Sequence, residues 1–304
     1  MTPDFTDLCL RAGLGRPLSP ATPVTGGLLH RMFRLTTTRG VWAVKLLRRE
    51  VMARPGVMAN MQRSEAVARA LSAHVPAVAA LTVDGSAVLA SDAGHCMIFP
   101  WQEGASVFPP DLSADHCRCI GDALGRIHRA GVTVPGLAPD TLPRPPLSWP
   151  EGCDDQLRRW DEQVIAAKAR LAGTQVISHR DLDPKNVLWQ AGRPLIIDWE
   201  AAGYVNPWQE LVEVLNYWAA DDAMARALIA AYARHMPLAS ADWPAALTAS
   251  LDSMLGWLHY NQGLARTAPD AAQRAEAARQ ADAAFAELRR CEARSARLLP
   301  LLTP

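Results

Sequence analysis

Three polar side chains stand out between residues 176 and 200, where short apolar runs alternate with loops: Asp181, Asn186 and Asp198. Each lies at the edge of an apolar run, where a strand would hold a loop rigidly. If the runs 187–189 and 195–197 pair as a hairpin, Asn186 and Asp198 come to the same end. Amide and carboxylate oxygens that converge there would suit Mg²⁺, which takes few protein ligands and keeps water and phosphate oxygens. The spacing therefore predicts a magnesium site at Asn186 and Asp198.

Asp181 precedes Asn186 by five residues and can point into the same space. A carboxylate there can accept a proton from a hydroxyl nucleophile, and phosphoryl transfer needs such a base together with a metal on the phosphates. The order His179-Arg-Asp181-x-x-x-x-Asn186, followed by Ile-Ile-Asp198, is typical of kinases. We interpret Asp181 as the catalytic base and His179 as structural, because such a histidine more often bonds backbone than performs chemistry. The alternative is a loop with chance polar residues.

The same residues carry a family resemblance. The stretch 179–189, with Ile196 to Trp199, resembles the aminoglycoside phosphotransferase and choline kinase-like family, which shares its fold with protein kinases. Gly121-x-x-Leu-Gly-x-Ile-His128 is similar to the helix that precedes the catalytic loop in that family. The chain departs from protein kinases at Asp183, where Ser/Thr kinases place a lysine. It also has Asp198-Trp-Glu in place of Asp-Phe-Gly, and no Ala-Pro-Glu follows.

The resemblance implies that the first lobe supplies a phosphate cover and a lysine. Gly26 and Gly27 precede an expected strand, and adjacent glycines let backbone N–H groups approach phosphate oxygens. Lys45 lies in Val-Trp-Ala-Val-Lys-Leu-Leu, on the same strand face as Val41 and Ala43. A lysine on an apolar face must reach an anion, so we expect Lys45 to contact ATP phosphates. The alternative is an edge-strand lysine that snorkels to solvent.

The other expected nucleotide contacts follow along the chain. Glu65, on the next helix, is our choice for the acid that orients Lys45; a surface pair with Arg69 four residues on is the alternative. Phe99 and Trp101 fall in the hinge expected near residue 100, where adenine would bond backbone. Trp101 could line the base pocket or close the lobe interface.

The elements that must position these residues change character along the chain. Residues 1–100 read as strand-rich, with runs at 24–37, 41–47, 86–90 and 95–99 and one helix near 60–74. From residue 113 the apolar spacing becomes helical, with a helix at 154–171 and almost only helix after 208. We predict an α+β, bilobal protein kinase-like fold, with a small β-rich nucleotide-binding lobe at 1–100 and a larger, mainly helical lobe for catalysis and acceptor binding at 101–304.

Composition excludes several classes of partner. Lys+Arg and Asp+Glu are equal at 31 each, so no global field favours nucleic acid or an anionic membrane. The N-terminus has no basic region typical of a signal peptide, and no apolar run reaches the ~18 residues of a membrane span. Six scattered cysteines favour a reducing cytosol, so we expect a cytoplasmic protein. His116-Cys-Arg-Cys119 suggests zinc only weakly, because no second ligand pair follows.

The acceptor side is less specified, since this fold hosts many acceptors on one catalytic core. Asp183, Trp199 and Glu200 lie next to the predicted chemistry, and we expect them to contact the acceptor. Acids of the helical lobe could attract a cationic acceptor, although most exposed acids only solvate a helix. Its tryptophans could enclose a quaternary ammonium, but they are equally the core of a helical lobe.

We therefore expect an ATP- and Mg²⁺-dependent kinase, a monomer or weak homodimer, that phosphorylates a hydroxyl of a small molecule. An aminoglycoside or related antibiotic is the first acceptor class. A metabolite kinase for choline, an amino acid or a sugar would use the same chemistry with another pocket. A nucleotide-binding pseudokinase is a different class, against which the intact set Lys45, Asp181, Asn186 and Asp198 argues. A protein kinase is disfavoured by Asp183 and by the missing activation segment.

Overall fold

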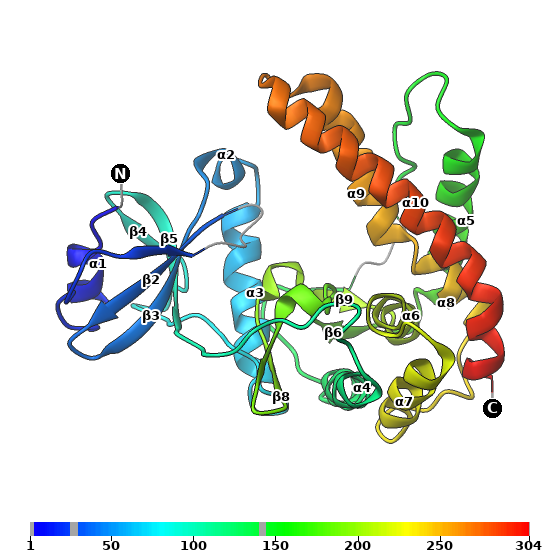
Figure 1. Ribbon diagram of the computed structural model, residues 1–304, viewed down its shortest axis with the longest axis horizontal. Helices are drawn as coiled ribbons and strands as arrows, with labels where there is room; N and C mark the ends of the chain where they lie inside the picture. Colours follow the sequence, from blue (N-terminus) through cyan, green and yellow to red (C-terminus); the bar gives the residue numbers. More distant parts are fainter. Residues whose placement is uncertain (1–2, 25–29, 140–143, 304) are drawn as a thin grey trace. The chain divides into compact units, whose positions relative to one another are not determined.

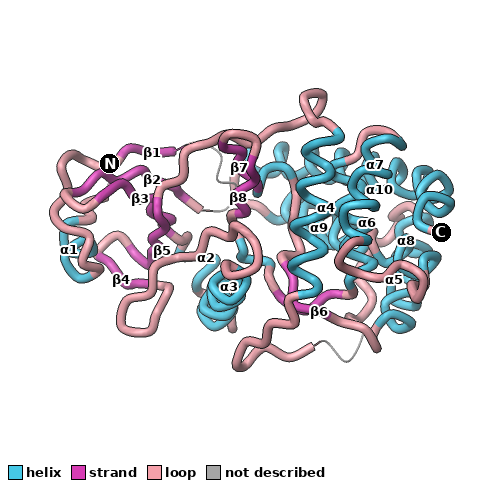
Figure 2. The backbone as a smooth tube through the Cα atoms, turned by 90° about the horizontal axis from the view of Figure 1, so that it is seen from below, coloured by secondary structure: helices cyan, strands magenta, loops and turns pink. Residues whose placement is uncertain are grey.

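The computed structural model describes residues 3–24, 30–139 and 144–303. Its contacts divide the chain into two compact units. The first unit joins three stretches: Met1–Phe108, Ala130–Leu137 and Ile177–Gly203. The second joins Pro109–Arg129, Ala138–Val176 and Tyr204–Pro304. The first unit holds most of the strands and the second is helical, so the predicted α+β class is confirmed (Figure 2).

The first unit is built on an antiparallel sheet of five strands in the order β1-β2-β3-β5-β4, all labelled in Figure 2. Thr37 pairs with Gly40, so the β2–β3 hairpin turns at Thr38 and Arg39. The strands are β1 (Thr22–Val24), β2 (Arg31–Thr37), β3 (Gly40–Leu46), β4 (Leu89–Ser91) and β5 (Gly94–Pro100).

Different helices cover the two faces of this sheet. The helices of the unit are α1 (Thr6–Arg11), α2 (Arg49–Met52) and α3 (Val57–Leu71). One face packs on α1 through buried Leu8, Phe33 and Val44, and the other packs on α3 through Met61 and Met97. Figure 1 shows α1 and α3 on opposite sides of the sheet. Apolar side chains that alternate along β3 and β5 thus form two cores.

A segment from far along the chain completes the first unit. Strands β7 (Val187–Gln190) and β8 (Arg193–Ile196) form the predicted hairpin, with Val187 opposite Ile196. The Val78 amide donates to the Ile196 carbonyl at 2.9 Å, and the Trp189 amide donates to the Ala105 carbonyl at 2.9 Å. These bonds fix the hairpin to the segments that follow α3 and β5. The neighbouring short elements are β6 (Val176–Ser178), the 3₁₀ turns η1 (Pro184–Asn186) and η2 (Trp199–Ala201), and β9 (Gly203–Val205).

The second unit is a set of packed helices. Trp160, Trp218 and Trp243 are buried in it, whereas Trp149 is only partly buried against the same helices. Its helices are α4 (Ala114–Arg129), α5 (Asp155–Leu171), α6 (Pro207–Trp218), α7 (Asp222–Ala233), α8 (Trp243–Ala249), α9 (Asp252–Thr267) and α10 (Ala271–Leu302).

Helices α4 and α7 cross closely because α4 carries glycine at the crossing. A Cβ atom on Gly121 would lie 2.2 Å from the Leu228 carbonyl oxygen, which no packing allows. Two turns later the buried His128 side chain bonds Glu210 at 2.8 Å and Tyr232 at 2.9 Å. His128 is therefore a packed residue that connects α4 to α6 and α7.

Several alternatives for other sites find no support in the described ranges. All six cysteines are free. Within residues 3–24, 30–139 and 144–303, no cluster of three or more His, Cys, Asp or Glu side chains is arranged to hold a metal, the 116–119 segment included. In the same ranges no helix combines the length and apolar character needed to cross a membrane.

Candidate active site

The catalytic loop is held by a buried histidine. His179 is fully buried, and its Nδ1 accepts the Asp181 amide at 3.2 Å. An amide can only donate, so the ring proton lies on Nε2, which donates to the Ile197 carbonyl at 3.0 Å. The ring also packs on Trp199, with centroids 4.6 Å apart. His179 thus joins the loop to the end of β8, the structural role expected for it.

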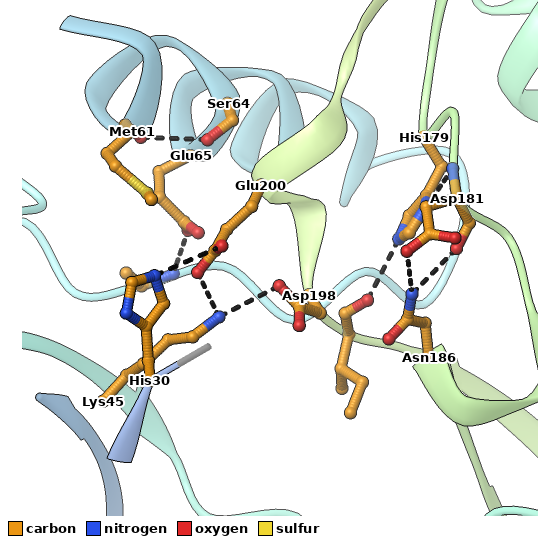
Figure 3. Close-up of polar contacts among 12 residues, drawn as sticks. His30, Lys45, Met61, Ser64, Glu65, His179, Asp181, Asn186, Asp198 and Glu200 are labelled. Carbon is orange, nitrogen blue, oxygen red and sulfur yellow. Dashed lines mark hydrogen bonds and ion pairs between the residues drawn. The ribbon is translucent and has the colours of Figure 1, made fainter. Parts of the chain in front are cut away.

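Asp181 and Asn186 lie together on this loop (Figure 3). The Asn186 amide nitrogen donates to the Asp181 carbonyl at 2.8 Å and to Asp181 Oδ2 at 2.9 Å. Lys185 Nζ lies 3.0 Å from Asp181 Oδ1, the other oxygen of that carboxylate. Burial raises the pKa of Asp181, although the Lys185 ammonium works in the opposite direction. The loop therefore presents a fixed carboxylate of increased basicity.

Asp198 follows β8, at the hairpin end where β7 begins. The Ile197 amide donates to the Asn186 carbonyl at 3.0 Å, so the predicted convergence of Asn186 and Asp198 on one end of the hairpin is confirmed. Asp198 adopts the left-handed conformation, with φ of 60°, which Asp tolerates better than most residues. Such a backbone conformation costs free energy and recurs at functional sites.

Lys45 reaches the same place from the sheet. It lies on β3 opposite Met32 and Met97, and it is 8% exposed. Its Nζ lies 3.0 Å from Asp198 Oδ1 and also forms an ion pair with Glu200. Burial disfavours the ammonium, but the charges of Asp198 and Glu200 outweigh it and raise the pKa of Lys45. The lysine on the apolar face thus binds anionic side chains that are distant in sequence, Asp198 being 153 residues further along the chain.

Glu200 and its neighbours complete this cluster. Glu200 Oε2 lies 3.6 Å from Nε2 of His30, the residue directly before β2. Burial disfavours the Glu200 carboxylate, but His30 and Lys45 overcome it and hold its pKa well below the usual range. Helix α3 packs on η2, which brings Glu65 close to this cluster (Figure 3).

Glu65 is 1% exposed, and its Oε2 accepts the Ala80 amide at 2.6 Å. Burial raises its pKa to about 7, against the stabilising effect of that amide and of Lys45. A role of Glu65 in orienting Lys45 stays a prediction, and the Glu65 carboxyl lies near enough to Lys45 for the ammonium charge to act on it. The lysine pairs with Asp198 and Glu200, because η2 places Glu200 nearer to it than α3 places Glu65. The alternative expected for Glu65, a surface ion pair with Arg69, does not form. Glu65 is buried, and the Arg69 guanidinium donates to the Ala80 carbonyl instead.

Comparison with known proteins places this arrangement in a family. Residues 20–247 match the phosphotransferase enzyme family. The chain belongs to that family. It resembles the spectinomycin phosphotransferase APH(9)-Ia, solved with ADP and spectinomycin, with a TM-score of 0.65 at 13% identity over 95% of this chain and 97% of that one.

Two further structures of the same fold are similar. The choline kinase LicA from Streptococcus pneumoniae has a TM-score of 0.64 at 15% identity, covering 94% of this chain and 99% of that one. An amicoumacin kinase, solved with AMP-PNP and Ca²⁺, has a TM-score of 0.62 at 14% identity and covers 93% of each chain. No curated protein sequence matches the chain. The predicted protein kinase-like fold and the resemblance to aminoglycoside phosphotransferases and choline kinases are confirmed, as is the prediction of a kinase enzyme of the small-molecule type.

The three residues expected to contact the acceptor have the following partners within the chain. Trp199 is 1% exposed, with its indole donating to the Ile196 carbonyl at 3.2 Å, so it packs inside the unit. Glu200 binds Lys45 on the donor side. Asp183 accepts the Lys185 amide at 2.8 Å and begins η1. Trp199 and Glu200 thus have a packing and a lysine-binding role here, and a contact of Asp183, Trp199 or Glu200 with the acceptor stays a prediction.

The expected hinge and loop residues are placed as follows. Phe99 packs at the edge of the cluster that contains Met61 and Met97. Trp101 lies under the Arg34 guanidinium at 5.0 Å, and its indole donates to Glu103 at 3.0 Å. A contact of either residue with a nucleotide stays a prediction. Gly26 and Gly27 lie outside the described residues.

Two residues of the site, Lys185 and His30, were not predicted from the sequence. Lys185 has a signal, because it stands four residues after Asp181 inside the catalytic motif. His30 has none, since a single histidine beside a glycine pair is indistinguishable from a surface residue until Glu200 is seen next to it.

Proposed function

We propose that this phosphotransferase is an ATP- and Mg²⁺-dependent kinase that transfers the γ-phosphoryl group to a hydroxyl of a small molecule. The observation that carries the proposal is the meeting of Lys45 with Asp198 at 3.0 Å, in the same compact unit as the Asp181–Asn186 pair. A cation for phosphates, oxygen ligands for a metal and a positioned base are the parts that phosphoryl transfer requires.

The donor set fits a nucleotide–metal complex. The Asn186 amide nitrogen is used by Asp181, which leaves the amide oxygen directed to the Asp198 side (Figure 3). The Asp198 side chain is 42% exposed, so its carboxylate is accessible. Two oxygen ligands of this kind suit Mg²⁺, which completes its shell with water and phosphate oxygens. When bound, the metal neutralises charge on the phosphates.

The residues of the chain then have separate tasks. Lys45 would bind donor phosphates, for which it must share its ammonium between them and the carboxylates of Asp198 and Glu200. Asp181 would accept the proton of the acceptor hydroxyl at one of its oxygens, and its raised pKa favours that transfer. Asn186 and His179 hold the Asp181 side chain and backbone in place. The proposal thus separates a donor side from an acceptor side.

An aminoglycoside or related antibiotic is the first acceptor class we propose. The support is the family membership and the fold shared with a spectinomycin phosphotransferase and an amicoumacin kinase. Acids in the second unit add little support, because several have structural partners. Glu210 bonds His128, Asp252 bonds Arg144, and Asp154 accepts a backbone amide at the start of α5.

A choline-type amino alcohol is the second acceptor class. On α9, Trp257 and Tyr260 are stacked with centroids 5.8 Å apart, and Trp257 is 37% exposed. Exposed aromatic faces attract quaternary ammonium groups. The fold is also shared with the choline kinase LicA.

An ADP-release screen over aminoglycosides, other antibiotics, amino alcohols and sugars tests the proposal. Asp181→Asn keeps the shape of the side chain and removes its charge, so turnover should fall by at least ~10²-fold. Its affinity for ATP·Mg²⁺, measured by calorimetry, should remain, because Lys45, Asn186 and Asp198 are unchanged. Asp7→Asn, in an exposed pair with Arg11 on α1, is the matched control and should have full turnover.

Two results would contradict the proposal. Turnover of Asp181→Asn near that of wild type would remove Asp181 from the mechanism. Tight ATP binding without turnover on any acceptor would favour a nucleotide-binding pseudokinase.

A further inference from the structure

Lysine is rare in this chain. Of its 31 Lys and Arg residues, only three are lysines: Lys45, Lys168 and Lys185. Lys168 forms an ion pair with Asp252 in the second unit. The other two lie at the candidate active site, one on the donor side and one on the catalytic loop. An ammonium is a compact point charge on a flexible stem, whereas guanidinium is a rigid planar fork. Two of the three lysines, Lys45 and Lys185, thus lie at the predicted site of phosphoryl transfer.

Lys185 is held beside the base but not enclosed. Its amide is bonded to Asp183 at the start of η1, which fixes the backbone. Its Nζ lies 3.0 Å from Asp181 Oδ1 and 3.4 Å from Asp183 Oδ2, and the side chain is 42% exposed. An ammonium has three N–H donors, so these two carboxylates leave one for another acceptor. The geometry therefore presents a cation with free capacity next to Asp181.

The chemistry of the base places the phosphoryl group within reach. The acceptor hydroxyl must lie about 2.6–3.2 Å from the Asp181 carboxylate to give up its proton. Its oxygen must approach phosphorus to about 3–3.5 Å before attack. An ammonium already in contact with Asp181 is thus within a small side-chain movement of the oxygens of that phosphoryl group. Those oxygens carry the charge that spreads in the transition state, where a positioned cation is most effective.

We propose that Lys185 is a catalytic residue whose ammonium contacts the γ-phosphoryl oxygens of ATP while it remains near Asp181. The inference rests on the proposed function and extends it by a second cation. A role limited to the ion pair with Asp181 explains less, because half-exposed ion pairs contribute little free energy. Such a pair alone would also weaken the base. Contact with the phosphoryl group draws the ammonium away from Asp181, and this leaves the carboxylate free to accept the proton.

An ATP analogue with an acyl group on its terminal phosphate reads out the contact directly. A lysine amine near that phosphate takes the acyl carbon, the acyl–phosphate oxygen bond breaks, and ATP leaves. With only three lysines, mass spectrometry assigns the product without ambiguity. We expect acylation of Lys185, blocked by excess ATP, and none at Lys168. The corresponding ADP analogue, acylated on its β-phosphate, should label Lys45 in preference.

The outcomes separate this inference from the proposed function. Labelling of Lys45 alone by the ATP analogue would overturn the role of Lys185 and leave nucleotide binding intact. No nucleotide-protected labelling of any lysine would overturn both proposals.

Variants give an independent readout. Lys185→Met keeps the stem and removes the charge, and kcat should fall about 10²-fold, the lower range for loss of one electrostatic contact to a transition state. The Kd for ADP should stay within twofold, because ADP lacks the γ-phosphoryl group, and this also shows that the variant is folded. Lys185→Arg should recover part of kcat. An unchanged kcat in Lys185→Met, or a change only in the KM for the acceptor, would overturn the proposal.

Discussion

Replacement of Glu65 by glutamine tests the electrostatics around Lys45. Glu65 and Glu200 both lie near this lysine, and the fold shifts their pKa values in opposite directions. Glu65→Gln keeps an oxygen that can accept the Ala80 amide and removes the titration of the carboxyl. If the free energy of unfolding depends on pH differently in wild type and in the variant, the difference therefore comes from the Glu65 carboxyl.

The magnitude follows from the pKa of the buried carboxyl. It rises from its ordinary value of 4.5 to about 7, and each tenfold change in a proton equilibrium is worth about 1.4 kcal/mol. The folded chain keeps this proton to a higher pH than the unfolded chain does. The free energy of unfolding of the wild type therefore falls as pH rises from about 4.5 to about 7 and then levels off. Between pH 5 and pH 8 this contribution amounts to roughly 2–3 kcal/mol.

Urea unfolding at pH 5, 6, 7 and 8, followed by circular dichroism, measures the effect. The free energy of unfolding of Glu65→Gln, relative to wild type, should rise by roughly 2–3 kcal/mol over this range. If the slope of the free energy of unfolding against urea concentration is the same at each pH and in both proteins, the same unfolding transition is being compared.

Glu200→Gln is the matched control. The pKa of Glu200 is lowered, so its stabilising contribution is fully present above about pH 4.5 and is lost only as pH falls through the folded value. This variant should be less stable than wild type, because Lys45 loses one partner, yet by a constant amount from pH 5 to pH 8. For the Glu65→Gln variant, a free energy of unfolding that changes with pH in parallel with that of wild type would refute the reasoning. Glu65 would then titrate at its ordinary pKa in the folded chain.

Three further predictions follow from single contacts. Lys45→Ala should raise the KM for ATP and leave acceptor binding almost unchanged. If steady-state kinetics showed a loss of acceptor affinity alone, the assignment of Lys45 to the ATP site would be wrong. Asp198→Ala should abolish ADP release, whereas Asn186→Ala should weaken it and raise the Mg²⁺ requirement in a metal titration; full activity of Asp198→Ala at millimolar Mg²⁺ would exclude the metal assignment. Gly121→Ala should lower the free energy of unfolding by about 1–3 kcal/mol, because its Cβ would meet the Leu228 backbone. Gly256→Ala on α9, with open space around it, should be neutral or stabilising in the same urea assay, and equal stability of both variants would contradict the tight crossing of α4 and α7.

The sequence alone determined the local geometry of the catalytic segment. The spacing of Asp181, Asn186 and Asp198 around two short apolar runs implies a hairpin, and a hairpin brings its two ends together whatever surrounds it. The helices of the second unit were also readable, because their apolar spacing reflects burial of one face. Short-range periodicity and fixed motif spacing need no knowledge of distant partners.

Only the tertiary structure decided which distant groups meet. Lys45 was readable as a buried cation, but its choice of Glu200 over Glu65 depends on where η2 packs against α3. In the same way, Trp199 lies inside the unit because its ring covers His179, a contact that no local pattern encodes. The direction of a side chain on a short 3₁₀ turn is set by the burial it gains against other elements, and that free energy exists only once those elements are assembled.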